Sequence, residues 1–215
     1  MPGHVSESLI LRTYPFGEAD LVVSFLARDT GKQRGVAKRA RRIKHGFGAA
    51  LERLSHVQMH YVKRENRELV TLQEAEILRS PFDLSSSYEL GLVLDYLAEV
   101  TEHLLPAEET NERFFRLLLA MVDHLRETRE RGIWPVVTYF SLWSLRLAGL
   151  LGSLRVSNDS AAIVEEMLVL PVAKLPEREW KRQTAQDLRR VLVREIESHI
   201  ERKLLTAPMV EGIVE

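Results

Sequence analysis

The sequence predicts an α+β protein of two domains, in which a small β-barrel is followed by a domain built only of helices. Hydrophobic and polar residues alternate in short runs through the first 80 residues, whereas from Ser85 onward the hydrophobic residues recur with a period of 3.6. Charge divides at the same place, because residues 1–80 carry 14 basic and 9 acidic side chains and residues 81–215 carry 16 and 22. We therefore expect a barrel domain over 1–80 and a helical domain over 81–215, with different surfaces and partners.

Composition narrows the class of protein. Of the 215 residues 45% are hydrophobic and 28% are charged, which is typical of a folded domain. No apolar run approaches the roughly 20 residues of a membrane span, and the first residues lack the apolar core of a signal peptide. We therefore expect a cytoplasmic protein without membrane contact. The chain has no cysteine, which excludes disulfides and cysteine-liganded zinc.

The first 80 residues are expected to contain five short strands. Polar and apolar residues alternate in Ser8–Tyr14, the run Leu21–Leu26 is mostly apolar, and Asp29–Lys32 fits a hairpin turn into a third strand. Two further strands are expected over Leu54–Val62 and Leu69–Leu72. Five strands with a long connection between the third and fourth match the OB fold, a partly open barrel that binds oligonucleotides or oligosaccharides.

That long connection, Gly35–Gly48, is the most distinctive stretch of the chain. Between Lys32 and Lys44 there are seven lysines and arginines and no carboxylate, so their charge must be neutralised from outside the segment. A mobile basic loop with an aromatic residue suits a polyanion, through phosphate contacts and a stacking ring. The candidate DNA-binding residues are Lys32, Arg34, Lys38, Arg39, Arg41, Arg42, Lys44 and Phe47. The alternatives are a solvated basic turn for the cations and a hydrophobic anchor for Phe47.

The second domain is expected to contain four long helices and one short one. Serines at 85–87 cap the first helix, which stops before Pro106, and Pro135 suits the first turn of the third. That third helix is apolar on almost every side, which predicts the buried centre of the domain. The expected helices run over about 88–105, 110–128, 135–147, 160–170 and 179–205.

Three motifs resemble the RecO family of bacterial recombination mediators. They are the opening Glu7–Asp20, Gly31 followed by Gly35–Arg42, and Tyr139-Phe140 with the downstream Leu147–Gly152. The resemblance implies an N-terminal OB domain, a helical C-terminal domain and binding of single- and double-stranded DNA. It also implies annealing of complementary strands coated by single-stranded DNA-binding protein, and loading of the recombinase together with RecR. Such a mediator would be expected in the cytoplasm, associated with the nucleoid.

One segment departs from the pattern of many RecO proteins, which carry a four-cysteine zinc ribbon after the central helix. Residues 152–176 replace that ribbon in this chain and contain no cysteine. Interactions that depend on the ribbon are therefore not carried over, and no metal or other cofactor is expected. Packing must hold the segment instead, through Ile163, Met167, Leu168 and Leu170.

The sequence contains no complete catalytic motif that would favour an enzymatic function. Asp29–Lys32 resembles the end of a phosphate-binding P-loop, but the first glycine of that motif would fall at Leu26. His56 and His60 share a strand face without a third metal ligand in view. The sequence has neither a Gly-x-Ser-x-Gly elbow nor a catalytic cysteine. We therefore expect no catalytic residue and no enzymatic activity.

The helical domain is expected to bind the tail of single-stranded DNA-binding protein, which the resemblance names as a partner. That tail is acidic and ends in apolar residues, so its receptor needs cations beside an apolar slot. The candidates are Arg126, Arg129, Arg131 and Trp134, with Arg178, Lys181 and Arg182 as a second choice. The alternative is structural, since cations favour helix C-termini and Trp134 could cap the core.

The sequence therefore predicts a DNA-binding recombination mediator that acts in DNA repair. The alternative function is an adaptor, in which the OB domain binds RNA or an anionic oligosaccharide and the helical domain binds protein. Competition between single-stranded DNA, RNA and heparin would separate the two.

Overall fold

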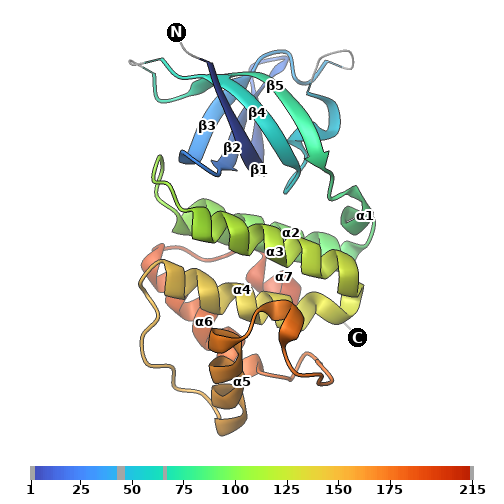
Figure 1. Ribbon diagram of the computed structural model, residues 1–215, viewed down its shortest axis with the longest axis vertical. Coiled ribbons are helices and arrows are strands. Elements are labelled where there is room, and N and C mark those ends of the chain that lie inside the picture. Colours follow the sequence, from blue (N-terminus) through green and yellow to red (C-terminus); the bar gives the residue numbers. More distant parts are fainter. Residues whose placement is uncertain (1–2, 43–46, 65–66, 214–215) are drawn as a thin grey trace. The chain divides into compact units, whose positions relative to one another are not determined.

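The computed structural model describes residues 3–42, 47–64 and 67–213 (Figure 1). The chain forms two compact units. The first comprises Met1–Phe82 with Leu105–Phe115, and the second comprises Asp83–Leu104 with Arg116–Glu215. The first unit therefore contains the strands together with one short segment, Leu105–Phe115, from the helical half of the sequence.

Five strands close into a barrel in the order β1-β2-β3-β5-β4. The strand β1 pairs with β2 on one side and β4 on the other, and β3 joins β5 in parallel to complete the circle. The predicted α+β fold with an N-terminal five-stranded barrel is therefore confirmed. The strands are β1 (Gly3–Phe16), β2 (Asp20–Ala27), β3 (Gly31–Ala37), β4 (His56–Val62) and β5 (Val70–Arg79).

The third strand corrects the predicted loop. Gly35–Ala37 pairs with β2 on one side and with β5 on the other, so these residues belong to the barrel wall. A Cβ atom at Gly35 would lie 2.7 Å from the side chains of Leu72 and Val70. Position 35 requires glycine because the barrel interior leaves no room for a side chain. Gly35, which the sequence predicted as the start of a loop, is therefore needed for packing.

The barrel core follows the predicted alternation of β4. Val57, Met59 and Tyr61 are buried, while the residues between them are partly exposed. They pack with apolar residues of the other strands, such as Ile10 and Phe25. Burial of one face of every strand supplies the main stabilisation of this unit.

Residues 105–115 belong to the barrel unit although they are the connection after the helix Tyr88–Leu104 and the first residues of the helix Glu112–Thr128. The Glu108 amide donates to the Lys32 carbonyl over 2.9 Å, and Arg28 forms ion pairs of 2.8 Å with both Glu7 and Glu112. Gly31 has a φ of +72°, and a Cβ atom there would lie 2.1 Å from the Glu109 carbonyl oxygen. This close approach explains why the turn before β3 needs glycine.

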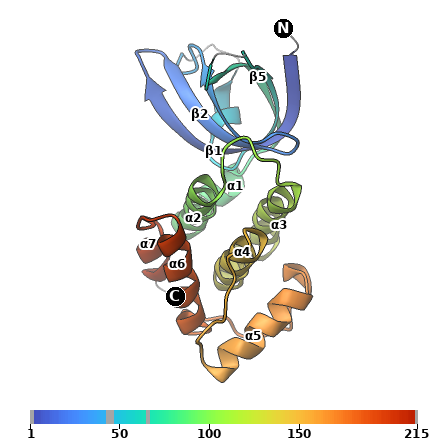
Figure 2. The same cartoon turned by 90° about the vertical axis from the view of Figure 1, so that its left-hand side faces the viewer.

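The helical unit is arranged around α4 (Figures 1 and 2). Twelve of its fifteen residues are buried, and it packs against α2, α5 and α6. The expectation of a buried central helix is confirmed. The helices are α1 (Phe82–Ser85), α2 (Tyr88–Leu104), α3 (Glu112–Thr128), α4 (Ile133–Leu147), α5 (Asn158–Val169), α6 (Gln186–His199) and α7 (Ala207–Glu211), with short 3-10 turns η1 (Gly48–Leu51), η2 (Arg129–Gly132) and η3 (Val172–Lys174).

A short helix, α5, stands in the segment that replaces the zinc ribbon, as expected from its sequence. Two aromatic side chains of α4 bind its C-terminal end, because Trp143 Nε1 donates to the Met167 carbonyl over 2.8 Å and the Tyr139 hydroxyl donates to the Leu170 carbonyl over 3.2 Å. Carbonyls at the C-terminal end of a helix lack backbone donors within the helix, and here the two aromatic side chains supply the missing hydrogen bonds. Ile163 and Met167 are buried, as predicted; Leu168 and Leu170 are only partly so.

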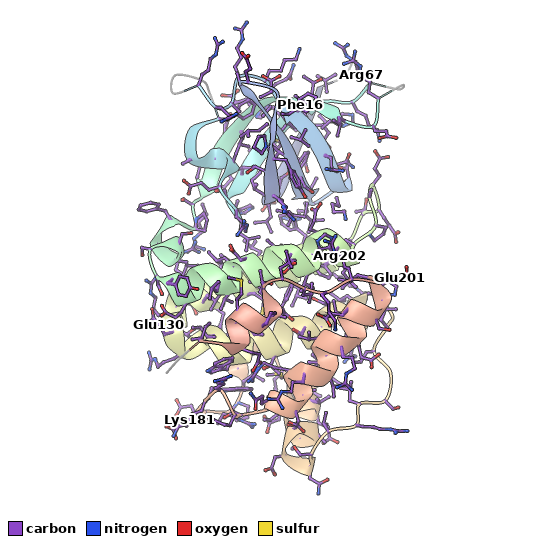
Figure 3. All side chains as sticks on the ribbon, turned by 180° about the vertical axis from the view of Figure 1, so that it is seen from behind. Phe16, Arg67, Glu130, Lys181, Glu201 and Arg202 are labelled. Carbon is purple, nitrogen blue, oxygen red and sulfur yellow. The ribbon has the colours of Figure 1, made fainter. Side chains whose placement is uncertain are left out.

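The last helix is shorter than predicted. Of the predicted range 179–205 only α6 is helical, and the separate short helix α7 follows beyond that range. The guanidinium of Arg189 is buried and donates to the carbonyls of Thr184 and Arg182, so these groups are not available for helical hydrogen bonds. At the other end Glu201 has a φ of +53°, which ends α6. Figure 3 labels Glu201 and Arg202 at this end.

Candidate nucleic-acid interface

The outer face of β1, β2 and β3 carries an exposed group of basic and aromatic side chains. The strand register places Arg12, Ser24 and Arg34 in one row across the three strands. The next row holds Tyr14, with Val22 and Val36 opposite. Directly paired residues point to the same side of a sheet, so both rows face outward together.

Two cations of this face lie close to the Tyr14 ring. The guanidinium carbon of Arg12 is 4.8 Å from the centre of the Tyr14 ring, and that of Arg34 is 5.7 Å away. Both distances are within the range of a cation–π interaction. We call Arg12, Tyr14 and Arg34 the Tyr14 triad. Two residues further along β1, the side chain of Phe16 is 52% exposed (Figure 3).

A basic turn, which we define as Lys38, Arg39, Arg41 and Arg42, follows β3 directly. Its backbone is held by the turn between β1 and β2, since the Arg39 amide donates to Asp20 Oδ1 over 2.7 Å and the Arg41 amide to the Ala19 carbonyl over 3.0 Å. The long mobile loop that the sequence predicted is therefore replaced, as far as residue 42, by a fixed turn. The hydrogen bonds are made by the backbone, so the side chains remain exposed.

The charges of the basic turn are poorly neutralised by the protein. The Arg41 guanidinium donates to the Glu18 carbonyl over 3.3 Å, which is a neutral acceptor. Within the part of the chain that the structure describes, no ion pair joins the side chains of Lys38, Arg39 or Arg42 to a carboxylate. These cations are therefore free to contact an external anion.

The remaining predicted residues divide into three groups. Lys32 and Arg34 lie on β3, where Arg34 belongs to the outer face and Lys32 is partly buried. Phe47 is only 6% exposed and packs in the barrel core, so the predicted stacking ring is corrected to the hydrophobic anchor. Lys44 lies outside the described residues.

Arg12, Tyr14 and Phe16 were missed as site residues in the sequence. They alternate along one strand at positions i, i+2 and i+4, so a strand prediction alone places them on one face. The sequence alone does not give the register of β2 and β3, and this register is what brings Arg34 to the same face as Arg12 and Tyr14.

The arginines predicted to bind a partner tail are engaged within the helical unit. Arg126 forms ion pairs with Asp123 (2.9 Å) and Asp83 (3.2 Å), and Arg129 donates to the Asp83 carbonyl over 3.1 Å. Trp134 is 4% exposed, and the Arg189 guanidinium lies 4.5 Å from the centre of its ring. Arg131 is exposed. The structure therefore does not bring these residues together as an open basic and apolar slot, which corrects the predicted pocket.

A groove of about 480 Å³ between α6 and α7 has that combination instead. Its apolar lining includes Val193, Leu204 and Pro208. Arg190 and Arg194 lie one helical turn apart at its edge and are exposed, and neither forms an ion pair with any residue that the structure describes. The other basic lining residues are paired, Arg189 with Glu211 and Lys203 with Glu197.

Metal-ligand geometry is not found in the described part of the chain. No group of three or more histidine, aspartate or glutamate side chains there could hold a metal ion. His56 contacts Glu7 over 2.7 Å and His60 contacts Glu76 over 3.6 Å, so each histidine has a carboxylate partner of its own. Of the helices described, none is long and apolar enough to span a membrane.

Comparison with known proteins agrees with this architecture. Residues 1–81 match the model of the family described as "Recombination protein O N terminal", and residues 85–155 match "Recombination protein O C terminal". A protein of Koribacter versatilis named "DNA repair protein RecO" is 36% identical over 242 aligned positions, which cover 97% of this chain and 98% of the relative. The chain belongs to the RecO family.

Other members named "DNA repair protein RecO" match over part of their length. That of Syntrophotalea carbinolica is 35% identical over 56% of this chain and 46% of the relative. That of Bifidobacterium animalis is 34% identical over 66% of this chain and 62% of the relative. Membership of the RecO family gives the chain a role in DNA repair and recombination, as a mediator that is not an enzyme.

Proposed function

We propose that this protein binds single- and double-stranded DNA through the outer face of its barrel and anneals complementary strands. The observation that carries the proposal is the basic turn, whose exposed side chains lack carboxylate partners and whose backbone is fixed by the β1–β2 turn. Because the backbone of the turn is already held, binding has to order only its side chains, and these release the counterions that surround a phosphate backbone.

Annealing follows from the same charges. Two complementary strands repel each other through their phosphates, and cations held at one surface lower that repulsion for both. Arg34 and Arg12 extend the basic surface from the turn onto the barrel wall. Contacts of these cations with phosphates do not depend on base sequence, as an annealing factor requires.

The salt dependence of binding tests the proposal. Each phosphate contact to a single strand contributes about 0.7 to the slope of log K against log salt concentration. Replacing Arg39, Arg41 and Arg42 by alanine should therefore reduce the slope by about 2 and weaken binding to DNA of any sequence. Fluorescence anisotropy with a labelled oligonucleotide at several salt concentrations measures it.

A matched control comes from the second half of the chain. Arg113, Arg116 and Arg155 are exposed, and their replacement by alanine removes the same total charge. This variant should keep the slope of the unaltered protein. Equal losses in the two variants would show that net charge, and not the basic turn, governs binding, and the proposal would then fail.

We further propose that the helical unit binds the acidic tail of single-stranded DNA-binding protein in the groove between α6 and α7. The tail requires cations beside an apolar slot, and the groove offers Arg190 and Arg194 beside Leu204 and Pro208. Binding of RecR and loading of the recombinase complete the proposed role; they rest on family membership.

Two charge-reversed variants locate the tail site. Arg190→Glu with Arg194→Glu should weaken binding of a fluorescent acidic tail peptide at least about tenfold, by repulsion of its carboxylates. Arg126→Glu with Arg129→Glu should retain affinity for the peptide, because those arginines are already bonded to Asp83 and Asp123 within the helical unit. Circular dichroism must show that both variants are folded. Loss of affinity in the second variant alone would return the site to the end of α3.

A further inference from the structure

Phosphate binding does not account for the aromatic side chains on the outer face of the barrel. Tyr14 and Phe16 are aromatic residues and not cations, and the Phe16 ring remains 52% exposed. Both point outward from the same strand as Arg12, in the alternation of a regular strand. A protein that only neutralised phosphates would gain nothing from rings at these positions.

The rings are placed beside the cations. The guanidinium carbons of Arg12 on β1 and Arg34 on β3 lie 4.8 and 5.7 Å from the centre of the Tyr14 ring. Phe16 pairs across the sheet with Asp20, and Asp20 accepts the amide hydrogen of Arg39 in the basic turn. One continuous surface therefore runs from planar guanidinium and aromatic groups to exposed cations.

Planar groups of this kind bind the faces of nucleobases. Stacking on aromatic rings and on arginine does not depend on base identity, because every base has a π face. In a duplex both faces of each base are covered by neighbouring bases, so this contact is open only to unpaired nucleotides. Phosphates, by contrast, are exposed in single strands and duplexes alike.

We propose that Tyr14 and Phe16, together with the guanidinium groups of Arg12 and Arg34, form a base-stacking surface that binds unpaired nucleotides only. The basic turn contacts the phosphates of either form of DNA. The inference rests on the proposed DNA-binding function and deepens it, since it assigns single-strand recognition to the rings of Tyr14 and Phe16, which are distinct from the cations of the basic turn that supply general affinity.

The chain of 215 residues and three labelled probes of equal length test the assignment. The probes are an oligo-dT strand, a strand of the same length with abasic sites throughout, and a duplex. The unaltered protein should bind oligo-dT more tightly than the abasic strand. Replacing Tyr14 and Phe16 by alanine should weaken binding to oligo-dT at least about tenfold and abolish that difference. Affinity for the abasic strand and the duplex, and the salt slope, should stay unchanged.

Conservative variants separate stacking from packing. Tyr14→Phe keeps the ring and should retain the preference for oligo-dT, whereas leucine at both positions keeps apolar bulk without a π face and should behave like alanine. Phe16→Ala alone changes an exposed side chain and should lower the preference partially without affecting thermal stability. A preference for oligo-dT that survives both alanine substitutions overturns the stacking surface, and so does an equal loss of duplex binding.

The two proposals fail in different ways. If the unaltered protein binds none of the three probes, the DNA-binding function is wrong, and the stacking surface falls with it. If it binds all three, and the alanine variant shows the same ratio of affinities, the basic turn remains in place and only the stacking surface is lost.

Discussion

The arginines of the barrel and those of the helical unit differ in what surrounds them. The guanidinium groups of Arg39 and Arg42 are exposed and pair with no carboxylate within the described residues. In the helical unit Arg126 joins two aspartates, and Arg189 is 1% exposed and pairs with Glu211 over 2.7 Å. The comparison shows that a guanidinium has two distinct uses here, one in binding and one in folding, and that its neighbours decide which.

This difference makes opposite predictions for stability and for binding. An arginine that satisfies buried groups should be needed for folding, whereas an exposed arginine without partners should be dispensable for folding and needed for binding. Removal of individual side chains in each unit can therefore test the comparison directly.

The largest effect is expected at Arg189. Its replacement by alanine leaves Glu211 without its partner, removes donors to the Thr184 carbonyl and uncovers Trp134. The free energy of unfolding should fall by about 3–5 kcal/mol, as for other broken buried ion pairs. Chemical denaturation measures it, with Arg190→Ala as the neighbouring exposed control. A loss of less than about 1 kcal/mol would show that the buried guanidinium is not structural.

A smaller effect is expected at Asp187, which connects α6 to the start of α5. Burial would raise the pKa of this carboxyl, but hydrogen bonds from the Ser157 amide (2.7 Å) and the Ser160 hydroxyl (2.5 Å) outweigh it and hold the pKa at about 2. Asp187→Asn should lower the free energy of unfolding by about 1–2 kcal/mol at neutral pH.

The pH dependence of that loss follows from the sign of the shift. The folded pKa is below the ordinary value of 3.8, so the stabilisation is complete above 3.8 and is lost as the pH falls through about 2. The stability difference between the unaltered protein and Asp187→Asn should therefore shrink over this window. A difference that stayed constant down to pH 2 would mean that shape, and not charge, matters at this position.

The smallest effect on stability is expected in the basic turn. Arg42→Ala removes an exposed side chain whose own guanidinium has no carboxylate partner among the described residues, so the free energy of unfolding should change by less than about 0.5 kcal/mol. The same variant should reduce the salt slope for single-stranded DNA by about 0.7. Substantial destabilisation with an unchanged slope would place Arg42 with the structural arginines and end the distinction.

Local patterns were sufficient to predict most of the fold. Alternation predicted that Val57, Met59 and Tyr61 share one face of a strand, and this face is buried in the barrel. The absence of a polar stripe predicted that α4 lies at the centre of the helical unit. These features depend on residues close in sequence. The change from strands to helices therefore follows from periodicity, whereas the place of residues 105–115 in the barrel unit does not.

The errors arose where distant residues decide the outcome. Phe47 has the same sequence context whether its ring is a stacking surface or a core residue, and only the packed barrel distinguishes them. The residues around Arg189 in the sequence have the pattern of a surface helix. Its side chain is nevertheless buried, where it pairs with Glu211 and lies over the Trp134 ring. The Tyr14 triad likewise needs the register that brings Arg34 beside β1.

The contact between α4 and α5 has a consequence for chemical robustness. Trp143 and Tyr139 hold the end of α5 by hydrogen bonds, in the segment where many members of the family use zinc and thiolates. Thiolates are oxidised in steps that end irreversibly, and a zinc site is lost when its ligands are protonated or its metal is removed. Since this chain has no cysteine, thiolate oxidation and loss of a thiolate-bound zinc do not act on that part of its fold, and its oxidisable side chains are Met167 and Trp143 instead.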